Sequence, residues 1–219
     1  MISAVVLAAG GSTRFGAPKQ LLKMGGSTLL ETVVGKFLES KVDEVIVVLG
    51  HDSEFIRRKV ALGRARVVTN RDYGRGLGSS IRVGIEAVSP ESRAAILALG
   101  DQPLISVVTV NALVQKYLET GGPVVAPYFR RRRGNPVLFD RKLFPYLKKI
   151  KGDRGAKAVV KEHGWRVARV DVKDPGVLVD IDSKADYQRV LGELPEGRRR
   201  LPSKGTPPAR RRTRKGVLR

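Results

Sequence analysis

The N-terminal stretch constrains the fold of this chain more than any other, because a continuous apolar run there meets a glycine-rich turn. Residues 3–9 (SAVVLAA) lack the alternation of a strand that is exposed on one face. Such a run is typical of a strand covered on both faces in a parallel sheet. Gly10 and Gly11 follow, and without Cβ atoms they let backbone N–H groups come close to an anion. We predict a buried strand that ends in an anion-binding loop.

Apolar patterns along the rest of the chain alternate between buried strands and amphipathic helices. Thr28 and Glu31 have the spacing of a capping box. Helices are predicted at about 27–39 and 52–62, with others opening near residues 79, 106, 152 and 182. Strands are predicted at 43–50, 65–69, 94–100, 123–127 and 165–172. We therefore expect a three-layer, Rossmann-like α/β fold, in which a mostly parallel twisted sheet is flanked by helices and ligands bind at the carboxyl ends of the strands.

The composition indicates one folded domain followed by a basic tail. A chain of 219 residues, 42% of them hydrophobic, can bury one good-sized core, which we assign to residues 1–194. Residues 195–219 hold ten Lys or Arg and one Glu, which gives +9 of the net charge of +21. This tail has little to bury and should be disordered by itself. Nonspecific RNA contact through the tail is one interpretation, and a solvated extension is the other.

Several kinds of protein and site are excluded by what the sequence lacks. It has no Cys, which excludes disulfides, thiolate metal sites and a Cys nucleophile. The apolar run at residues 3–9 is too short to cross a bilayer and has no basic leader before it. We expect no membrane anchor and a cytoplasmic location. His51 and His163 are interpreted as structural, since both are far from the predicted loops.

Two cations follow the glycines of the predicted anion-binding loop. Arg14 offers a planar fork that holds phosphate oxygens in two places, and Lys19 offers a mobile point charge. The loop has neither the Gly-x4-Gly-Lys-Ser/Thr pattern of a Walker A motif nor the Gly-x-Gly-x-x-Gly pattern of a dinucleotide fingerprint. A triphosphate would use both the glycines and the cations. The alternative is an ordinary turn whose cations are solvated.

Residues 7–22 (LAAGGSTRFGAPKQLL) resemble the signature Leu-Ala-Ala-Gly-x-Ser-x-Arg-Met/Phe-Gly-x-x-Lys of the molybdenum-cofactor nucleotidyltransferases. The similarity is closer to the cytidylyltransferase branch than to the guanylyltransferase branch. In that family the loop wraps the triphosphate of the incoming nucleotide. The resemblance implies that Arg14 and Lys19 are catalytic and neutralise the leaving pyrophosphate. The nucleotide-binding residues that it implies here are Leu7, Ala8, Ala9, Gly10, Gly11, Ser12, Arg14, Phe15, Gly16 and Lys19.

A second segment extends the resemblance around the nucleotide. Residues 70–82 (NRDYGRGLGSSIR) are similar to a segment that lines the nucleotide pocket in the cytidylyltransferase branch. The residues that this similarity implicates are Asn70, Gly78, Ser79 and Ser80. From the residues alone, Ser79 or Ser80 is an ordinary helix N-cap.

Asp101 follows a predicted buried strand, at the edge of the sheet where a ligand site is expected. Mg²⁺ needs only one or two carboxylates beside phosphate oxygens and water, so Asp101 suffices as an anchor. Residues 100–103 (GDQP) match a family element whose Asp binds the metal, which makes Asp101 a catalytic residue, a metal ligand and a nucleotide contact by resemblance. A turn completed by Pro103 is the structural alternative.

The second half of the chain carries elements that resemble the acceptor side of the family. Four adjacent arginines, residues 130–133, precede residues 134–139 (GNPVLF), which match a Gly-x-Pro-Val-Leu-Phe element. Asn135 stands where relatives often have His, which leaves the acceptor open. Residues 152–157 (GDRGAK) are similar to an element near the acceptor site. The implied acceptor-binding residues are Arg133, Asn135, Pro136 and Asp153. A solvated arginine loop and a helix cap at Asp153 are the structural alternatives.

The last motif, residues 180–186 (DIDSKAD), resembles the family's Asp-Ile-Asp-Thr-x-x-Asp. The resemblance makes Asp182 a candidate second metal ligand. A cap of the final helix by Asp182 or Ser183 explains the motif equally well.

These resemblances, which cover roughly residues 1–190, imply a Mg²⁺-dependent nucleotidyltransferase. It would transfer CMP from CTP to the phosphate of molybdenum-molybdopterin and release pyrophosphate. Such a reaction needs positioning and charge neutralisation rather than a protein nucleophile. The same fold acting on GTP, a sugar phosphate or another acceptor is one alternative. A nucleic-acid-associated protein that uses the basic tail is the second, against which stands the low aromatic content of 5%.

Overall fold

A mixed sheet with helices on both faces forms the part of the chain that the structure describes. The structure is a computed structural model, and it describes residues 1–11 and 15–193. The strand order is β10-β7-β9-β6-β1-β4-β5, with β8 paired to β7. The pairs β1–β4, β1–β6, β4–β5 and β7–β10 are parallel, and β9 runs antiparallel to β6 and β7. The predicted α/β fold with a mostly parallel sheet is confirmed.

The strand β1 (Ile2–Ala8) lies in the middle of the sheet and is buried along its whole length, as its continuous apolar sequence predicts. A separate ribbon joins β2 (Lys23–Met24) to β3 (Ser27–Thr28). The other strands are β4 (Glu44–Leu49), β5 (Arg66–Thr69), β6 (Ala94–Leu99), β7 (Val124–Phe129), β8 (Arg132–Arg133), β9 (Val137–Asp140) and β10 (Val167–Asp171).

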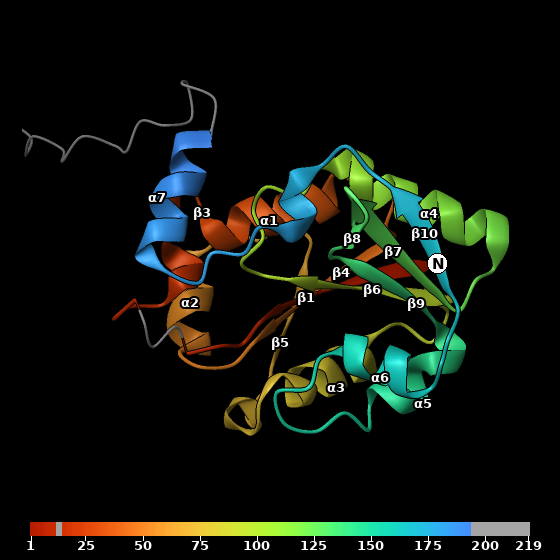
Figure 1. Cartoon of the computed structure of the whole chain (residues 1–219). Helices are drawn as coiled ribbons and strands as arrows, with labels where there is room; N and C mark the ends of the chain where they lie inside the picture. Colours follow the sequence, from red (N-terminus) through yellow and green to blue (C-terminus); the bar gives the residue numbers. More distant parts are fainter. Residues whose placement is uncertain (12–14, 194–219) are drawn as a thin grey trace, which may run out of the picture.

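Helices cover both faces of the sheet, as Figure 1 shows. On one face lie α1 (Leu29–Leu38) and α4 (Val107–Thr120), and on the other α3 (Leu77–Ala87), α5 (Phe144–Leu147) and α6 (Ala156–Glu162). The remaining α-helices are α2 (Ser53–Lys59) and α7 (Lys184–Glu193). Short 3-10 turns are η1 (Lys19–Leu21), η2 (Tyr73–Arg75), η3 (Arg141–Leu143) and η4 (Pro175–Leu178). None of the helices among the described residues is long and apolar enough to cross a membrane.

Capping signals in the sequence set several helix starts. The predicted capping box is present at α1, where Thr28 Oγ1 accepts from Glu31 N at 3.2 Å and the Glu31 carboxylate accepts from Thr28 N at 2.6 Å. Ser106 caps α4, because its Oγ accepts from Thr109 N at 3.1 Å. These side chains replace the hydrogen bonds that the first turn of a helix lacks.

Two local predictions need correction. The helix predicted at 52–62 ends at Lys59, because Val60 takes an extended conformation. The alternative of a solvated arginine loop holds only in part, because residues 130–132 are exposed and Arg133 is half-buried. Arg130 and Arg131 have φ angles of +45° and +67° and turn the chain, and residues 132–133 pair back onto β7 as β8.

The core has two large apolar clusters, one on each face of the sheet, and a smaller one beneath α7. The small cluster contains Met24, Leu29, Ile181 and Val190. It therefore fastens the C-terminal segment of the described chain to β2 and α1. This contact determines where residues 180–182 lie.

Candidate active site

Lys19 and Asp101 form an ion pair at the carboxyl ends of β1 and β6. Lys19 Nζ donates to Asp101 Oδ2 at 2.6 Å, and each side chain is 19% exposed. β1 and β6 are parallel neighbours, with Leu7 opposite Leu99. The loops that follow the two strands therefore emerge side by side, which joins two residues that are 82 positions apart.

The Asp101 carboxyl group is poorly compensated in this environment. Burial raises the pKa of Asp101, Lys19 lowers it, and the charges of Asp180 and Asp182 raise it again, so that the net shift is upward. Asp101 Oδ1 is buried and has no hydrogen-bond partner among the described residues. A buried carboxylate oxygen without a donor costs free energy unless a cation approaches it. Asp101 is therefore suited to a cation in addition to Lys19.

Residues 180–182 close around this ion pair from the C-terminal side. Ile181 N donates to Asp101 O at 3.0 Å, and Lys19 Nζ donates to Ile181 O at 3.2 Å. Lys19 Nζ also donates to Asp182 Oδ1 at 3.4 Å. The helix α7 begins after Ser183, whose Oγ accepts from Asp186 N at 3.1 Å. Ser183 is therefore the cap, and the Asp182 carboxylate faces the same ammonium group as Asp101.

The two carboxylates fit a metal that arrives with a phosphate ligand. No group of three or more His, Asp or Glu able to hold a metal ion occurs in residues 1–11 and 15–193. Mg²⁺ takes one or two protein carboxylates and completes its octahedron with phosphate oxygens and water. Asp101, with its unpartnered buried oxygen, and the neighbouring Asp182 supply that number.

A cavity of about 280 Å³, here called the donor cavity, opens beside the Lys19–Asp101 pair. It lies between the loop after β1, the start of α3 and the loop after β6. Among the residues proposed from the sequence as nucleotide contacts, those that line it are Leu7, Ala8, Ala9, Gly10, Lys19, Ser80 and Asp101. Its other lining residues are Gln20, Tyr73, Gly76, Leu77, Leu99, Gly100 and Asp153.

Asn70 and Ser79 lie behind the donor cavity rather than in its lining. Asn70 is 1% exposed, and its Nδ2 donates to Ser79 Oγ at 2.8 Å and to Ser80 Oγ at 3.0 Å. The structural alternative, in which Ser79 or Ser80 caps this helix, is wrong. The helix begins at Leu77 with Gly76 as N-cap and no side-chain cap. Asn70 therefore holds the first turn of α3 to the end of β5.

Other residues proposed as nucleotide contacts do not line this cavity: Gly11, Phe15, Gly16 and Gly78. Phe15 packs on the cluster beneath α7. A Cβ atom on Gly78 would lie 2.6 Å from Ile150 O, so this glycine permits close packing of α3. Ser12 and Arg14, together with residues 195–219, are outside the described residues.

His51 is closer to the site than the sequence suggested. A Cβ atom on Gly11 would lie 3.0 Å from His51 Cδ2, and His51 N donates to Ala9 O at 3.2 Å. The prediction that His51 is far from the loop was wrong. The cause is the parallel pairing of β1 with β4, which brings the residues after both strands together.

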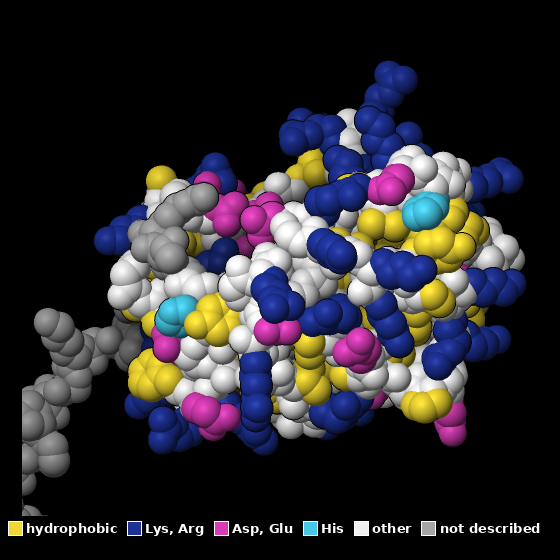
Figure 2. Space-filling model, turned by 90° about the horizontal axis from the view of Figure 1, so that it is seen from below, with side chains coloured by type: hydrophobic (Ala, Val, Ile, Leu, Met, Phe, Trp, Pro, Cys, Tyr) yellow, Lys and Arg dark blue, Asp and Glu magenta, His cyan; other side chains and the backbone are white. Residues whose placement is uncertain are grey.

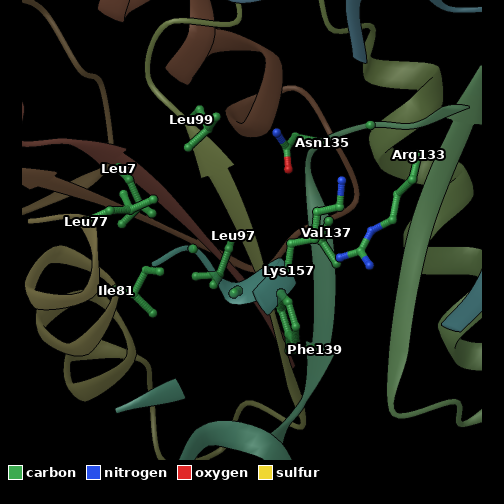
Figure 3. Close-up of a pocket in the computed structure, with 13 residues that line it drawn as sticks. Leu7, Leu77, Ile81, Leu97, Leu99, Arg133, Asn135, Val137, Phe139 and Lys157 are labelled. Atoms are coloured by element: carbon green, nitrogen blue, oxygen red, sulfur yellow. The ribbon is translucent and has the colours of Figure 1, made fainter. Parts of the chain in front are cut away.

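A second cavity of about 240 Å³, here called the central cavity, adjoins the donor cavity and shares Leu7, Leu77 and Leu99 with it. Figure 3 shows its apolar side chains, with Leu77 and Ile81 on one side and Arg133 reaching in from the other. The complete lining is Leu7, Leu77, Ile81, Leu97, Leu99, Arg133, Gly134, Asn135, Val137, Phe139, Gly155, Ala156 and Lys157. Burial lowers the pKa of the Arg133 guanidinium.

The proposed acceptor residues separate into two pairs. Arg133 and Asn135 line the central cavity, whereas Pro136 and Asp153 do not. Asp153 lines the donor cavity together with Gly76. The two are close, because Asp153 Oδ1 would lie 2.6 Å from a Cβ atom on Gly76. It does not cap α6 either, because the N-cap is Gly155. The backbone contact between Gly78 N and Gly152 O, at 2.9 Å, draws Asp153 to the start of α3.

Sequence reasoning missed residues that support or line the site. Gln20 is 3% exposed, and its Nε2 donates to Ala8 O at 2.8 Å and to Gly10 O at 3.1 Å, which braces the loop after β1. Gln102 Nε2 donates to Asp180 and ties the loop after β6 to the C-terminal segment. Lys157 adds a second cation to the central cavity. Each lies within a quoted motif, but only the folded contacts show what each amide or amine touches.

Comparison with known proteins identifies a family for this chain. Residues 4–168 match the family described as the MobA-like NTP transferase domain. The nicotine blue oxidoreductase of Paenarthrobacter nicotinovorans is 32% identical, over 87% of this chain and 96% of its own length. The purine catabolism protein PucB of Bacillus subtilis (strain 168) is 31% identical, over 85% of this chain and 94% of its own.

Solved structures agree with this assignment. An Rv0371c homologue from Mycobacterium sp. strain JC1 superposes with a TM-score of 0.79 at 32% identity, covering 87% of this chain and 95% of its own. Rv0371c of Mycobacterium tuberculosis H37Rv, in complex with manganese, has a TM-score of 0.77 at 30% identity, covering 88% and 99%. The chain therefore belongs to the MobA-like NTP transferase domain family and is a nucleotidyltransferase of that type.

Proposed function

We propose that this protein is a Mg²⁺-dependent cytidylyltransferase that transfers CMP from CTP to the phosphate of molybdenum-molybdopterin and releases pyrophosphate. The observation that carries the proposal is the partly buried Lys19–Asp101 pair at 2.6 Å, beside a cavity and an unpartnered Asp101 oxygen. Phosphoryl and nucleotidyl transfer depend on positioning and charge neutralisation, and an ammonium group next to a buried carboxylate meets that need.

The nucleotide occupies the donor cavity in this proposal. Its base lies against the end of β1, residues 7–9, and Ser80 at the start of α3, and its phosphates lie toward Gly10 and Lys19. Lys19 and Arg14 neutralise the pyrophosphate that leaves. Asp101 and Asp182 hold Mg²⁺, which when bound offsets the negative charge of the triphosphate. The manganese complex of Rv0371c supports a divalent metal in a relative with the same fold.

The acceptor occupies the central cavity. This cavity shares three leucines with the donor cavity, so a phosphate at its inner end is next to the nucleotide. An oxygen of that phosphate attacks the α-phosphorus, and the bond to the β-phosphate breaks as pyrophosphate leaves. Arg133 and Lys157 supply positive charge for the acceptor. No protein nucleophile is required.

The choice of CTP and of a pterin acceptor rests on the resemblance of residues 7–22 and 70–82 to the cytidylyltransferase branch. The assay is pyrophosphate release with Mg²⁺ and each of CTP, GTP, ATP and UTP, with molybdopterin or its molybdenum form as acceptor. Release that needs both CTP and the pterin is the expected result. If no nucleotide reacts with the pterin while one of them raises the melting temperature with Mg²⁺, the acceptor is wrong and a sugar phosphate or another phosphate takes its place.

A further inference from the structure

A third cavity of about 690 Å³, here called the outer cavity, continues from the central cavity. The two share Arg133, Gly155 and Lys157, whereas the outer cavity shares no lining residue with the donor cavity. Its further lining residues, from α6 and the turn after it, are Ala158, Val160, Lys161, Gly164 and Trp165. The three cavities therefore follow one another, with the Lys19–Asp101 pair at one end and α6 at the other.

The outer cavity is positively charged without compensation. Its charged lining residues are Arg133, Lys157 and Lys161, and no Asp or Glu lines it. Within residues 1–11 and 15–193, none of these three cations has an ion-pair partner. The carboxylate next to Lys161 in sequence, Glu162, pairs with Arg154 instead. Figure 2 shows Lys and Arg spread over this face of the molecule.

The half-buried Arg133 guanidinium favours the binding of an anion. A guanidinium removed from water costs free energy unless an anion approaches it, and burial lowers its pKa accordingly. Arg133 lies where the central and outer cavities meet. An anionic group of a ligand that passes from one cavity to the other offsets that cost.

Trp165 gives the outer cavity a rigid apolar wall. Its ring stacks on His163, with centroids 4.9 Å apart and planes at 14°. Tyr146 contacts both rings edge-on, at 5.2 Å from Trp165 and 4.8 Å from His163. An aromatic cluster of this kind fixes the indole in place. Because the sequence contains one Trp, its fluorescence reports on this cavity alone.

We propose that the outer cavity binds a second anionic group of the acceptor, so that the acceptor class is a compound with a phosphate at one end, an apolar or planar body, and negative charge at the other end. Lys157 and Lys161 bind that remote group beside Trp165, and the apolar body fills the central cavity. The inference rests on the proposed function in one respect, that the central cavity holds the acceptor.

The test uses linear alkane-α,ω-bisphosphates of increasing length and the matching monoalkyl phosphates, without nucleotide. Dissociation constants are measured by calorimetry on the full chain, and the emission of Trp165 is recorded in the same titration. One range of lengths should bind about tenfold tighter than its monophosphate and shift the emission, as expected for one added charge-assisted contact. If no bisphosphate binds tighter than its monophosphate at any length, the inference is wrong.

The variants Lys157→Gln and Lys161→Gln should lose the preference for bisphosphates. The matched control is Lys41→Gln, an exposed lysine whose backbone N donates to Asn111 of α4, on the opposite face of the sheet. The basic tail is present in every variant and cancels from the comparison. A loss of preference in Lys41→Gln as large as in Lys161→Gln would show general attraction to a basic protein and overturn the inference.

Failure of this inference and failure of the proposed function give different results. A bisphosphate preference that needs Lys161, without CTP-dependent pyrophosphate release, supports the outer site and contradicts the cytidylyltransferase. CTP- and pterin-dependent release without any bisphosphate preference supports the enzyme and contradicts the outer site.

Discussion

At the scale of single residues, folding favours the protonated form of Asp101, whereas its proposed role requires the ionised form. Because the native state raises the pKa of Asp101, it binds the proton more tightly than the unfolded chain does. The free energy of unfolding therefore falls as pH rises from the usual value of 3.8 through the raised value. Above the raised pKa the ionised carboxylate costs stability, a cost that groups at functional sites often carry.

We expect Asp101→Asn to abolish turnover without lowering the melting temperature. The amide keeps the shape of the side chain and removes the buried charge, but it is a poor metal ligand. Pyrophosphate release measures the first part, and calorimetry with and without Mg²⁺ and nucleotide measures the second, since ligand should stabilise the parent protein and not the variant. Normal turnover would contradict the role of Asp101, and a large fall in melting temperature would contradict the electrostatic argument.

Lys19→Gln should reduce pyrophosphate release by about 10²–10³-fold, because a positioned positive charge that faces a developing anion contributes at that level. Lys23→Gln is the control, since this nearby lysine is exposed and does not line the donor cavity. Steady-state rates under saturating nucleotide distinguish the two. Equal rates in both variants would remove Lys19 from the reaction.

Glu44 shows the opposite electrostatic behaviour. Burial by itself would raise its pKa, but hydrogen bonds from Ser3 Oγ, Arg66 and Ser89 N lower it below the usual 4.5. Its stabilising effect is present above pH 4.5 and is lost as pH falls through the lowered value. Glu44→Gln should cost about 1–3 kcal/mol at neutral pH and much less in acid. Denaturant unfolding at several pH values measures this, and a cost independent of pH would contradict the prediction.

At the scale of secondary structure, the distance between α3 and the sheet sets the shape of the site. The helix contributes Leu77 and Ser80 to the donor cavity, and Leu77 and Ile81 to the central cavity. It approaches β1 closely at Gly84, where a Cβ atom would lie 2.4 Å from Val5 Cγ1. A displaced α3 would therefore deform both cavities together.

Gly84→Ala should destabilise the fold by about 1–3 kcal/mol, because the added methyl group forces α3 away from β1. Gly35→Ala in α1 is the matched control, since a Cβ atom there has nothing within 4 Å. It should stabilise the fold by about 0.5–1 kcal/mol through helix propensity. Urea unfolding of both variants tests the pair, and a similar effect in both would contradict the packing argument.

The sequence predicts elements well where the cause is local. The continuous apolar run of β1, the capping box at Thr28 and the Ser106 cap all depend on neighbouring residues, and the structure contains each of them. Side-chain direction at the site depends on distant contacts instead. Asp153 lies at the donor cavity rather than on the acceptor side because Gly78 N bonds Gly152 O, a contact that no spacing reveals.

The same distinction explains the errors around α3 and β4. Ser79 is a residue type that often caps helices, yet Asn70, which directly follows β5, donates to its hydroxyl oxygen inside the first turn of the helix. His51 lies beside Gly11 only because β1 and β4 pair in parallel. The positions of Ser79 and His51 thus depend on contacts between separate elements of the fold, which the local pattern does not show.

At the scale of the whole molecule, the apolar core of the described residues reaches α7, and the basic tail follows it in the sequence. The three apolar clusters use residues between Ile2 and Leu191. Because the tail has little to bury, a chain that ends at residue 194 should keep its melting temperature and its pyrophosphate release. Any salt-dependent RNA binding of the full chain should be lost with the tail. Filter binding at several salt concentrations measures the last property.

A chain that ends at residue 182 provides the contrasting control, because it lacks α7 and Val190 of the small cluster. It should melt at a lower temperature, since the lost contacts hold residues 180–182 beside Lys19. If the chain ending at residue 194 loses activity as well, the tail belongs to the enzyme rather than to an accessory function.

The row of three joined cavities has an evolutionary consequence. The walls of the donor cavity come largely from the ends of β1 and β6 and from α3, whereas the outer cavity is lined by α6, the residues on either side of it and Arg133 of β8. Substitutions in α6 after a gene duplication would change which acceptor is recognised and leave the inherited donor chemistry intact. Divergence in this lineage should therefore accumulate in α6 and the residues around Arg133 sooner than around Asp101.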